Sequence, residues 1–412
     1  MVRGLFALVF TFAFLSSEAA VLLGVDRLRM AAFAASVLAL AAVAMARAGG
    51  LDPRAKTVPA LLALLLGTMA LRDLAQDLDP LDYKLVLPVL VLLAAPDIAR
   101  ALGRHDPARL ALGLLAGYVT LALLLATTGA PGPRLRGYEG FVRYDFTGSL
   151  VAHSGLCLIF AAAGATQWRA MRNAALRAAW AGLLMLAVAM LLLAATRTVI
   201  VTLALLGALH LHAAADKGRM LRRLLLLGCS GGAVFLVYTV LVSDAFFLRL
   251  FSSEIQDFSS GRAYSQLYWL GLAAEHPLGL GLGAVRDLLE GGRPALDGDR
   301  LLEWPHNEWL RLFIEGGIAG VAWLALLVGW LARRTLAAAR AERDPLRRSL
   351  MLAILADMIA QSLLQNYFNG IYYATAMVLT LAVLLFREET ATGGGAATGP
   401  SGAEGMRVLR QG

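Results

Sequence analysis

Charged residues are scarce in this sequence, and cysteines are almost missing. Of the 412 residues, 16% are charged and 59% are hydrophobic, whereas charged residues make up about a quarter of an ordinary soluble domain. This deficit excludes a typical soluble enzyme and indicates a polytopic membrane protein. Cys157 and Cys229 are the two cysteines and both lie in apolar runs, so we expect neither a disulfide framework nor a cysteine metal site.

The sequence signals of several enzyme classes are missing as well. The chain has no zinc-ligand spacing, no P-loop and no Ser-His-Asp order. Gly279, Gly281 and Gly283 loosely match a dinucleotide-binding fingerprint, but no predicted strand precedes them. We interpret these glycines as a tight turn, with an anion-binding nest of backbone N–H groups as the alternative. We expect no cofactor and no nucleic-acid partner.

Apolar runs long enough to cross about 30 Å of hydrocarbon recur along the chain. The segment MVRGLFALVFTFAFLSSEAA has the layout of a signal peptide, but the apolar run resumes at Val21, so we interpret it as the first membrane helix. The hydropathy pattern predicts about twelve membrane helices, near residues 4–24, 30–48, 58–75, 83–96, 108–127, 147–166, 176–195, 197–214, 221–243, 306–332, 349–366 and 370–387.

These helices give an all-α fold with one long polar interruption. The sequence predicts membrane helices one to nine in residues 1–243, a loop with interfacial helices in 244–305, membrane helices ten to twelve in 306–389, and a flexible tail in 390–412. The segments on the side of the two termini carry roughly 23 Lys and Arg, against roughly 13 on the other side. The positive-inside rule therefore predicts cytoplasmic termini and an external long loop.

Two arginines are predicted near the external side. Arg197 lies between two apolar runs in MLLLAATRTVIVTLALL, and an unpaired arginine at a helix centre costs at least about 2.5 kcal/mol. It therefore needs an anionic partner or a wet cavity, unless it snorkels from a helix end. Arg262 and Tyr264 open SGRAYSQLYWLGLAAEHPLGLGLG, which predicts a helix at the membrane surface. A planar guanidinium suits a phosphate, and an ordinary surface arginine is the alternative for Arg262.

His306 directly follows the long loop and precedes a long apolar helix. Histidine is the side chain that can accept a proton from a hydroxyl near neutral pH. The alternative is a helix-start histidine whose ring packs on Trp304 or Trp309. Three charged residues follow it at spacings of three and four, share one helix face, and are expected to pair with one another: Glu308, Arg311 and Glu315.

Two acidic clusters lie in the predicted external loops. Asp297 and Asp299 resemble the paired acids that hold a metal in many sugar-nucleotide transferases, but GRPALDGDR fits a turn at least as well, so we predict no metal site. Three acids in DLAQDLDPLDYK are expected to cap helices, with orientation of an acceptor as the alternative: Asp77, Asp79 and Asp82.

Three patterns occur in a fixed order along the chain: the arginine in ATRTVIV, the segment GRAYSQLYWLGLAAEHPLGLGLG, and HNEWLRLFIEGGIAG. In this order they resemble the bacterial O-antigen ligase and O-antigen polymerase superfamily, whose members are GT-C-like membrane glycosyltransferases. The resemblance is specific in the last two motifs, over roughly residues 190–320, and generic elsewhere.

The resemblance implies an undecaprenyl-diphosphate-linked glycan as donor and a site facing the periplasm. It implies that Arg197 and Arg262 engage the lipid diphosphate and that His306 serves the acceptor hydroxyl. Arg286, Asn307 and Tyr264 are weaker candidates for binding the diphosphate or the acceptor.

Within the superfamily, the sequence favours a ligase over a polymerase. Polymerases often repeat a pattern of arginine, ten residues and glycine in two external loops, and this chain shows no such spacing. We therefore expect a metal-independent, inverting transfer of O-antigen to lipid A-core in the bacterial inner membrane. The alternatives are an O-antigen polymerase, a ligase that attaches glycan to a protein, and, in a different class, a flippase or transporter of lipid-linked glycan.

Overall fold

The structure is a computed structural model that describes most of the chain in twelve pieces: residues 1–14, 26–48, 53–75, 83–103, 105–127, 136–138, 141–143, 150–194, 196, 198–241, 262–291 and 302–393. The described part consists of helices and their connecting turns, with one short antiparallel hairpin, β1 (Arg136–Tyr138) and β2 (Phe141–Arg143). The all-α fold class is therefore confirmed.

A helix lies at each of the twelve places where the hydropathy pattern predicts one. These helices are α1 (Val2–Phe14), α3 (Asp26–Ala48), α4 (Pro53–Ala75), α5 (Tyr83–Leu102), α6 (Pro107–Thr127), α7 (Leu150–Ala170), α8 (Ala174–Ala194), α9 (Thr198–Ala213), α10 (Lys217–Leu241), α14 (Glu308–Ala341), α15 (Pro345–Leu364) and α16 (Ile371–Gly393).

Three helices continue at least six residues beyond their predicted ends. The helix α5 continues to Leu102 through Pro88 and Pro96, past the predicted end at residue 96. The helix α14 continues to Ala341, nine residues beyond the predicted end at 332. The helix α16 continues to Gly393, beyond residue 390 where the tail is predicted to begin, and residues 394–412 lie outside the described part.

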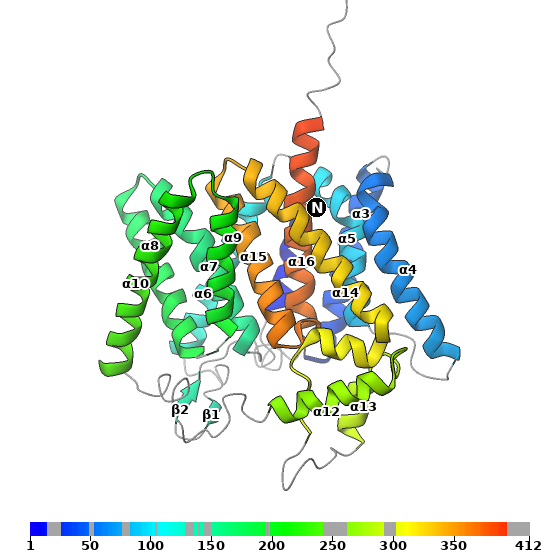
Figure 1. Cartoon of the computed structure of the whole chain (residues 1–412). Helices are drawn as coiled ribbons and strands as arrows, with labels where there is room; N and C mark the ends of the chain where they lie inside the picture. Colours follow the sequence, from blue (N-terminus) through cyan, green and yellow to red (C-terminus); the bar gives the residue numbers. More distant parts are fainter. Residues whose placement is uncertain are drawn as a thin grey trace, which may run out of the picture.

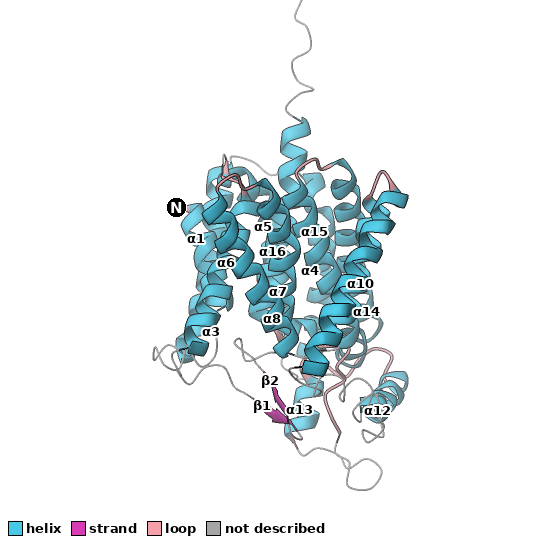
Figure 2. Ribbon diagram, turned by 90° about the vertical axis from the view of Figure 1, so that its left-hand side faces the viewer, coloured by secondary structure: helices cyan, strands magenta, loops and turns pink. Residues whose placement is uncertain are grey.

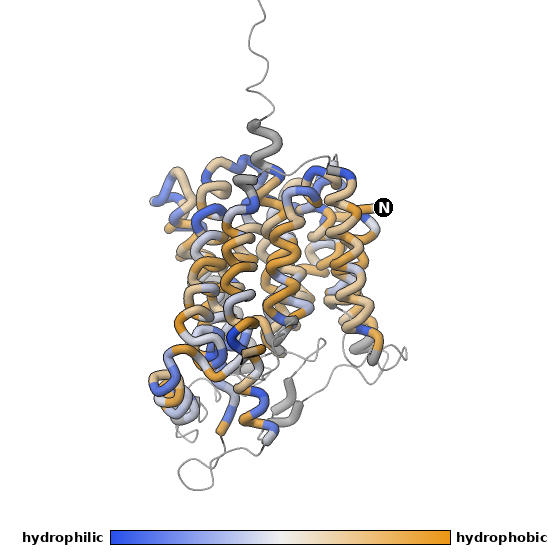
Figure 3. Tube along the Cα trace, turned by 90° about the vertical axis from the view of Figure 1, so that its right-hand side faces the viewer, coloured by the Kyte–Doolittle hydropathy of each residue, from blue (hydrophilic) through white to orange (hydrophobic). Residues whose placement is uncertain are grey.

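Six of the described helices are long and apolar enough to cross a membrane: α3, α4, α5, α6, α8 and α14. Three further apolar helices, α1, α9 and α16, are shorter by the same measure. In Figure 3 the middle of the bundle is apolar and polar residues gather toward its two faces, as a bilayer requires. The chain thus has the character of an all-α membrane protein, and the count of twelve crossings stays a prediction.

The bundle has two distinct faces (Figure 1). The start of α1 and the end of α16 lie at one face, which we call the terminal face. Two further helices, α12 (Arg262–Glu275) and α13 (Ala284–Glu290), lie against the opposite face, which we call the α12 face (Figures 1 and 2). The long loop predicted between residues 244 and 305 therefore contains helices.

The centre of the bundle is formed by α5, α15 and α16. The helix α16 packs on α5, and α15 packs on α7, α9 and α14. The helices α12 and α13 have a small core of their own that includes Trp269, Val285 and Ile314, so they are anchored on α14.

Candidate functional site

The site begins where the chain enters α14 from the α12 face. Asn307 has extended backbone angles (φ −154°, ψ 115°), and its side chain accepts a hydrogen bond from the Leu310 N–H at 3.1 Å. This is an N-cap, which satisfies one of the unpaired N–H groups of the first turn. His306, just before it, has φ 45°, an uncommon conformation for a residue with a Cβ. The half-buried His306 side chain is thus held by a strained backbone at a fixed helix start.

The first three turns of α14 contain a buried ion network. Arg311 Nε donates to Glu308 Oε1 at 2.8 Å, and Arg311 Nη1 donates to Glu315 Oε2 at 2.7 Å. All three side chains are buried, so the predicted pairing is confirmed. The second oxygen of Glu308 accepts the backbone N–H of Phe368 at 3.1 Å. The network therefore joins the start of α14 to the turn between α15 and α16, which includes the 3-10 helix η1 (Tyr367–Asn369).

The helix α14 is broken at Gly317, and the HPLGLGLG segment docks into the break. Leu280 N donates to the Ile314 carbonyl at 2.8 Å, Gly281 N to the Glu315 carbonyl at 3.0 Å, and Ile318 N to the Pro277 carbonyl at 3.0 Å. Backbone groups that lose their helical partners at the break are thus paired with the loop. The last two sequence motifs are therefore one structural unit.

Glycine is required both in α14 and in the loop that docks on it. Gly317 has φ 62° and ψ −147°, a region that residues with a Cβ avoid. A Cβ on Gly317 would lie 2.6 Å from the Leu278 carbonyl oxygen, and a Cβ on Gly279 (φ 86°) would lie 2.5 Å from the Glu315 carbonyl oxygen. Gly279, Gly281 and Gly283 all have positive φ, so the tight-turn interpretation is confirmed.

An ion pair at the end of α4 holds the docked loop from the other side. Asp73 is fully buried, pairs with Arg72, and accepts the Leu282 N–H at 2.7 Å. Arg72 donates to the carbonyls of Leu278 and Glu315, the latter at 2.9 Å. Loop, α4 and α14 are therefore fixed to one another by charged hydrogen bonds.

Below this surface lies a set of buried polar side chains from four parts of the chain, which we call the polar layer: His153, Ser154, Thr196, Asp357, Gln361 and Tyr373. Thr196 Oγ1 donates to Ser154 Oγ at 3.0 Å, and Gln361 Nε2 donates to Asp357 Oδ2 at 2.6 Å. Tyr373 donates to the same carboxylate. A Cβ on Gly155 would lie 2.8 Å from both Asp357 Oδ1 and Gln361 Nε2, so α7 and α15 meet closely at this level.

His306 contacts the end of α15, the helix that carries part of this layer. Its Nδ1 lies 3.3 Å from Oε1 of Gln365, the C-cap residue of α15. Asp357 and Gln361 are four residues apart, so they lie on one side of α15, and Gln365 follows the last turn of that helix. The imidazole thus lies at the end of the helix that carries Asp357 and Gln361.

Three of the predicted site side chains lie outside what the structure describes. These are the whole of Arg197 and the side chains of Arg262 and Tyr264, although the backbone of the latter two forms the first turn of α12. Thr196 and Thr198, which flank Arg197 in the sequence, are both buried, and Thr196 belongs to the polar layer. The convergence of Arg197, Arg262 and His306 therefore stays a prediction.

The weaker candidates have described positions. Arg286 is exposed on α13, where it pairs with Asp287 at 3.1 Å. Asn307 uses one lone pair of its carbonyl oxygen for the helix cap, which leaves its NH₂ group and the second lone pair for a contact with substrate. Their roles in binding stay predictions. Both acidic clusters, Asp77, Asp79 and Asp82 and also Asp297 and Asp299, lie outside the described residues.

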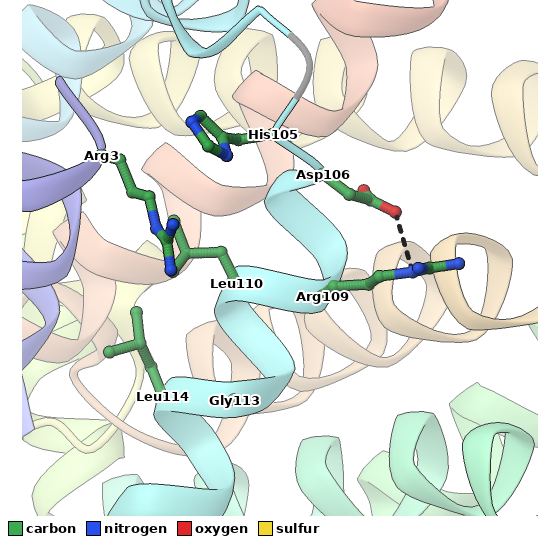
Figure 4. A pocket seen from close by; sticks show the side chains of 7 residues that line it. All are labelled: Arg3, His105, Asp106, Arg109, Leu110, Gly113 and Leu114. Atoms are coloured by element: carbon green, nitrogen blue, oxygen red, sulfur yellow. Dashed lines mark ion pairs between the residues drawn. The ribbon is translucent and has the colours of Figure 1, made fainter. Parts of the chain in front are cut away.

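A hollow at the terminal face does not belong to this site. It is lined by Arg3, the segment His105–Asp106, and one side of α6 from Arg109 to Leu114 (Figure 4). Arg109 pairs with Asp106 there at 3.6 Å. His306 lies at the other end of the bundle, because α14 starts at the α12 face (Figure 1).

Sequence reasoning missed Arg72, Asp73, Asp357 and Gln365. The dipeptide Arg72-Asp73 at the end of an apolar helix was a visible signal, and so was an acid inside the predicted helix 349–366 with glutamines four and eight residues later. Their partners are distant in the sequence, so the signal could not show what they bind.

No protein-family model matches the chain, and no curated protein matches its sequence. The family therefore rests on the motifs themselves and is a proposal.

Proposed function

We propose that this protein is a membrane glycosyltransferase of the O-antigen ligase type, which transfers a glycan from undecaprenyl diphosphate to a sugar hydroxyl of lipid A-core. The proposal assigns the α12 face to the periplasm and the terminal face to the cytoplasm of a bacterial inner membrane. The observation that carries it is the setting of His306, which is half-buried just before α14, has a strained backbone with φ 45°, and has its Nδ1 3.3 Å from Gln365 Oε1.

In the proposed reaction the acceptor oxygen attacks the anomeric carbon while the bond from that carbon to the phosphate oxygen breaks. His306 takes the hydroxyl proton, and the electron pair of the broken bond leaves with undecaprenyl diphosphate. Arg197 and Arg262 would stabilise the growing negative charge, because fixed cations act more strongly near a low-dielectric boundary than in bulk water. Attack opposite to the leaving group inverts the anomeric centre.

The test is transfer by purified protein in liposomes supplied with lipid-linked glycan and lipid A-core. His306→Ala should lower the transfer rate by at least about 100-fold, the contribution of a general base. His212→Ala is the matched control, because His212 contacts Arg340 at the far end of the bundle. Full transfer by His306→Ala would show that His306 is not the base. Transfer to a glycan instead of lipid A-core would indicate a polymerase, and transfer to a protein would indicate a protein ligase.

A second candidate function, a flippase, is favoured by one observation. Asp357 is buried within the bundle, about 10 Å along α15 from its end by the helical rise, and intramembrane carboxylates often mark transport pathways. The same liposomes distinguish the two, because a flippase moves labelled lipid across the bilayer without joining it to an acceptor. Asp357→Asn should abolish such movement in a flippase.

A further inference from the structure

The contact between His306 and Gln365 favours a hydrogen on one of the two ring nitrogens. Gln365 Oε1 lies 3.3 Å from His306 Nδ1. An amide oxygen can only accept a hydrogen bond, so Nδ1 must be the donor and carry the hydrogen. In a neutral imidazole the other nitrogen, Nε2, then holds the lone pair.

The backbone that carries the Gln365 side chain is anchored on both sides. The Gln365 N–H donates to the Gln361 carbonyl at 2.8 Å, which fixes this residue to the last turn of α15. Three residues later, the N–H of Phe368 is bound by Glu308 from α14 at 3.1 Å. Both ends of the short segment that carries the amide are thus anchored, one to α15 and one to the helix that His306 precedes.

The imidazole is oriented from its own side as well. Pro305 before it is buried, Asn307 after it caps α14, and His306 itself is kept at φ 45°. The two partners are 59 residues apart in the sequence and belong to different elements. A strained conformation persists when its surroundings over-determine it, and such residues cluster at functional sites.

We propose that Gln365 is a positioning residue for transfer: it holds His306 with a hydrogen on Nδ1, so that Nε2 is the atom that accepts the proton of the attacking hydroxyl. This inference rests on the proposed function of His306. When the proton moves to Nε2, the new bond from the acceptor oxygen to the anomeric carbon forms and the bond to the diphosphate breaks. The ring then has hydrogens on both nitrogens, and Gln365 still accepts the one on Nδ1.

A neutral amide suits this task better than a carboxylate. It orients the ring through a hydrogen bond, but it adds no negative charge that would hold the proton on the imidazolium. The ring can therefore release the proton after each transfer. In the buried network beside it, the carboxylates of Glu308 and Glu315 are already paired with Arg311.

The experiment is ¹⁵N solid-state NMR of protein with labelled histidine rings in bilayers, in which the signal of His306 is identified by its loss in His306→Ala. The wild-type ring should show a protonated Nδ1 and an unprotonated Nε2. Gln365→Leu keeps the bulk and removes the acceptor, so the ring should lose this preference. Gln365→Glu keeps an oxygen at the same place and should preserve the hydrogen on Nδ1.

The same variants are then assayed for transfer in liposomes. Gln365→Leu should lower the rate roughly 100-fold, as expected when the base no longer presents its lone pair. An unchanged NMR signal in Gln365→Leu overturns the inference, and so does a changed signal with a normal transfer rate. A wild-type protein with the expected ring form that joins no glycan overturns the proposed function instead, while the hydrogen bond itself is upheld.

Discussion

At the scale of single residues, the charged side chains at the start of α14 are buried, and they form hydrogen bonds with one another instead of with water. Arg311 is 1% exposed and lies between two carboxylates that are equally buried. Burying such charges is costly unless each is paired. Removing one partner should therefore lower the free energy of unfolding by more than the net stabilisation that the intact pair provides. The polar start of α14 thus connects this helix to the turn between α15 and α16, and it also holds the residue that His306 precedes.

We predict that Arg311→Met lowers the free energy of unfolding by about 3–5 kcal/mol, because it leaves two buried carboxylates without a cation. The matched control is Arg219→Met, which removes an exposed arginine that pairs with Asp216 three residues away, and its effect should stay below about 1 kcal/mol. Both effects are measured by unfolding the purified proteins in mixed micelles with increasing amounts of a denaturing detergent. Equal effects of the two substitutions would contradict a buried network.

At the scale of elements, the break in α14 and the loop that fills it form one joint. Gly317 has backbone angles that only glycine tolerates well, and Gly329 in the same helix has open space around it. These two glycines therefore make a matched pair within one element.

We predict that Gly317→Ala undocks the loop, at a cost of at least about 1–3 kcal/mol from backbone strain alone. The amides of Leu280 and Leu282, which donate to α14 and to Asp73, should lose protection in hydrogen exchange followed by mass spectrometry. Gly329→Ala should leave exchange unchanged and stabilise α14 by up to about 1 kcal/mol. Retained protection in Gly317→Ala would show that the break does not hold the loop.

The helix α12 has a packed side and an apolar exposed side. Trp269 and Ala273 are buried against α14, whereas Leu267 and Leu270 are 68% and 52% exposed. Leu278, whose carbonyl accepts a hydrogen bond from Arg72 of α4, is exposed as well. An exposed apolar side on α12 agrees with the interfacial helix that the sequence predicts.

We predict that the exposed leucines of α12 enter the outer leaflet. Spin labels at Leu267→Cys and Leu270→Cys, in a Cys229→Ser background, should be more accessible to oxygen than to a water-soluble nickel chelate in bilayers. A label at Glu290→Cys, on the exposed side of α13, serves as the aqueous control. Equal access of the chelate to all three positions would place this side of α12 in water.

At the scale of the whole molecule, the two faces of the bundle differ in what they present. The terminal face has the start of α1, the end of α16 and the hollow beside α6, whereas the α12 face has the docked loop and His306 (Figures 1 and 4). The proposed function requires the second face to be periplasmic, since lipid-linked glycans are joined to their acceptors there.

We predict that a membrane-impermeant maleimide labels Glu290→Cys in intact spheroplasts and labels Lys217→Cys only after lysis. Lys217 is exposed at the start of α10, in the turn after α9 that the positive-inside rule assigns to the cytoplasm. Both variants carry Cys229→Ser, and Cys157 is buried. The reverse labelling would show the opposite orientation in the membrane. His306 would then face the cytoplasm and could not reach a periplasmic donor.

The sequence by itself determined the all-α class, the positions of the helices and the pairing of Glu308, Arg311 and Glu315, because these depend on hydropathy and on spacing along one helix. It also indicated the turn at Gly279 to Gly283, since glycine tolerates positive φ. These are local properties, and the structure agrees with them.

The tertiary structure alone decided which distant groups meet. Arg72 is 243 residues from the Glu315 carbonyl that it binds, and Gln365 is 59 residues from His306. No periodicity or motif encodes such pairs, because they arise from how whole helices pack and where a helix is broken. For the same reason, the sequence predicted that His306 is a base, but only the tertiary structure showed that the amide of Gln365 lies beside its ring.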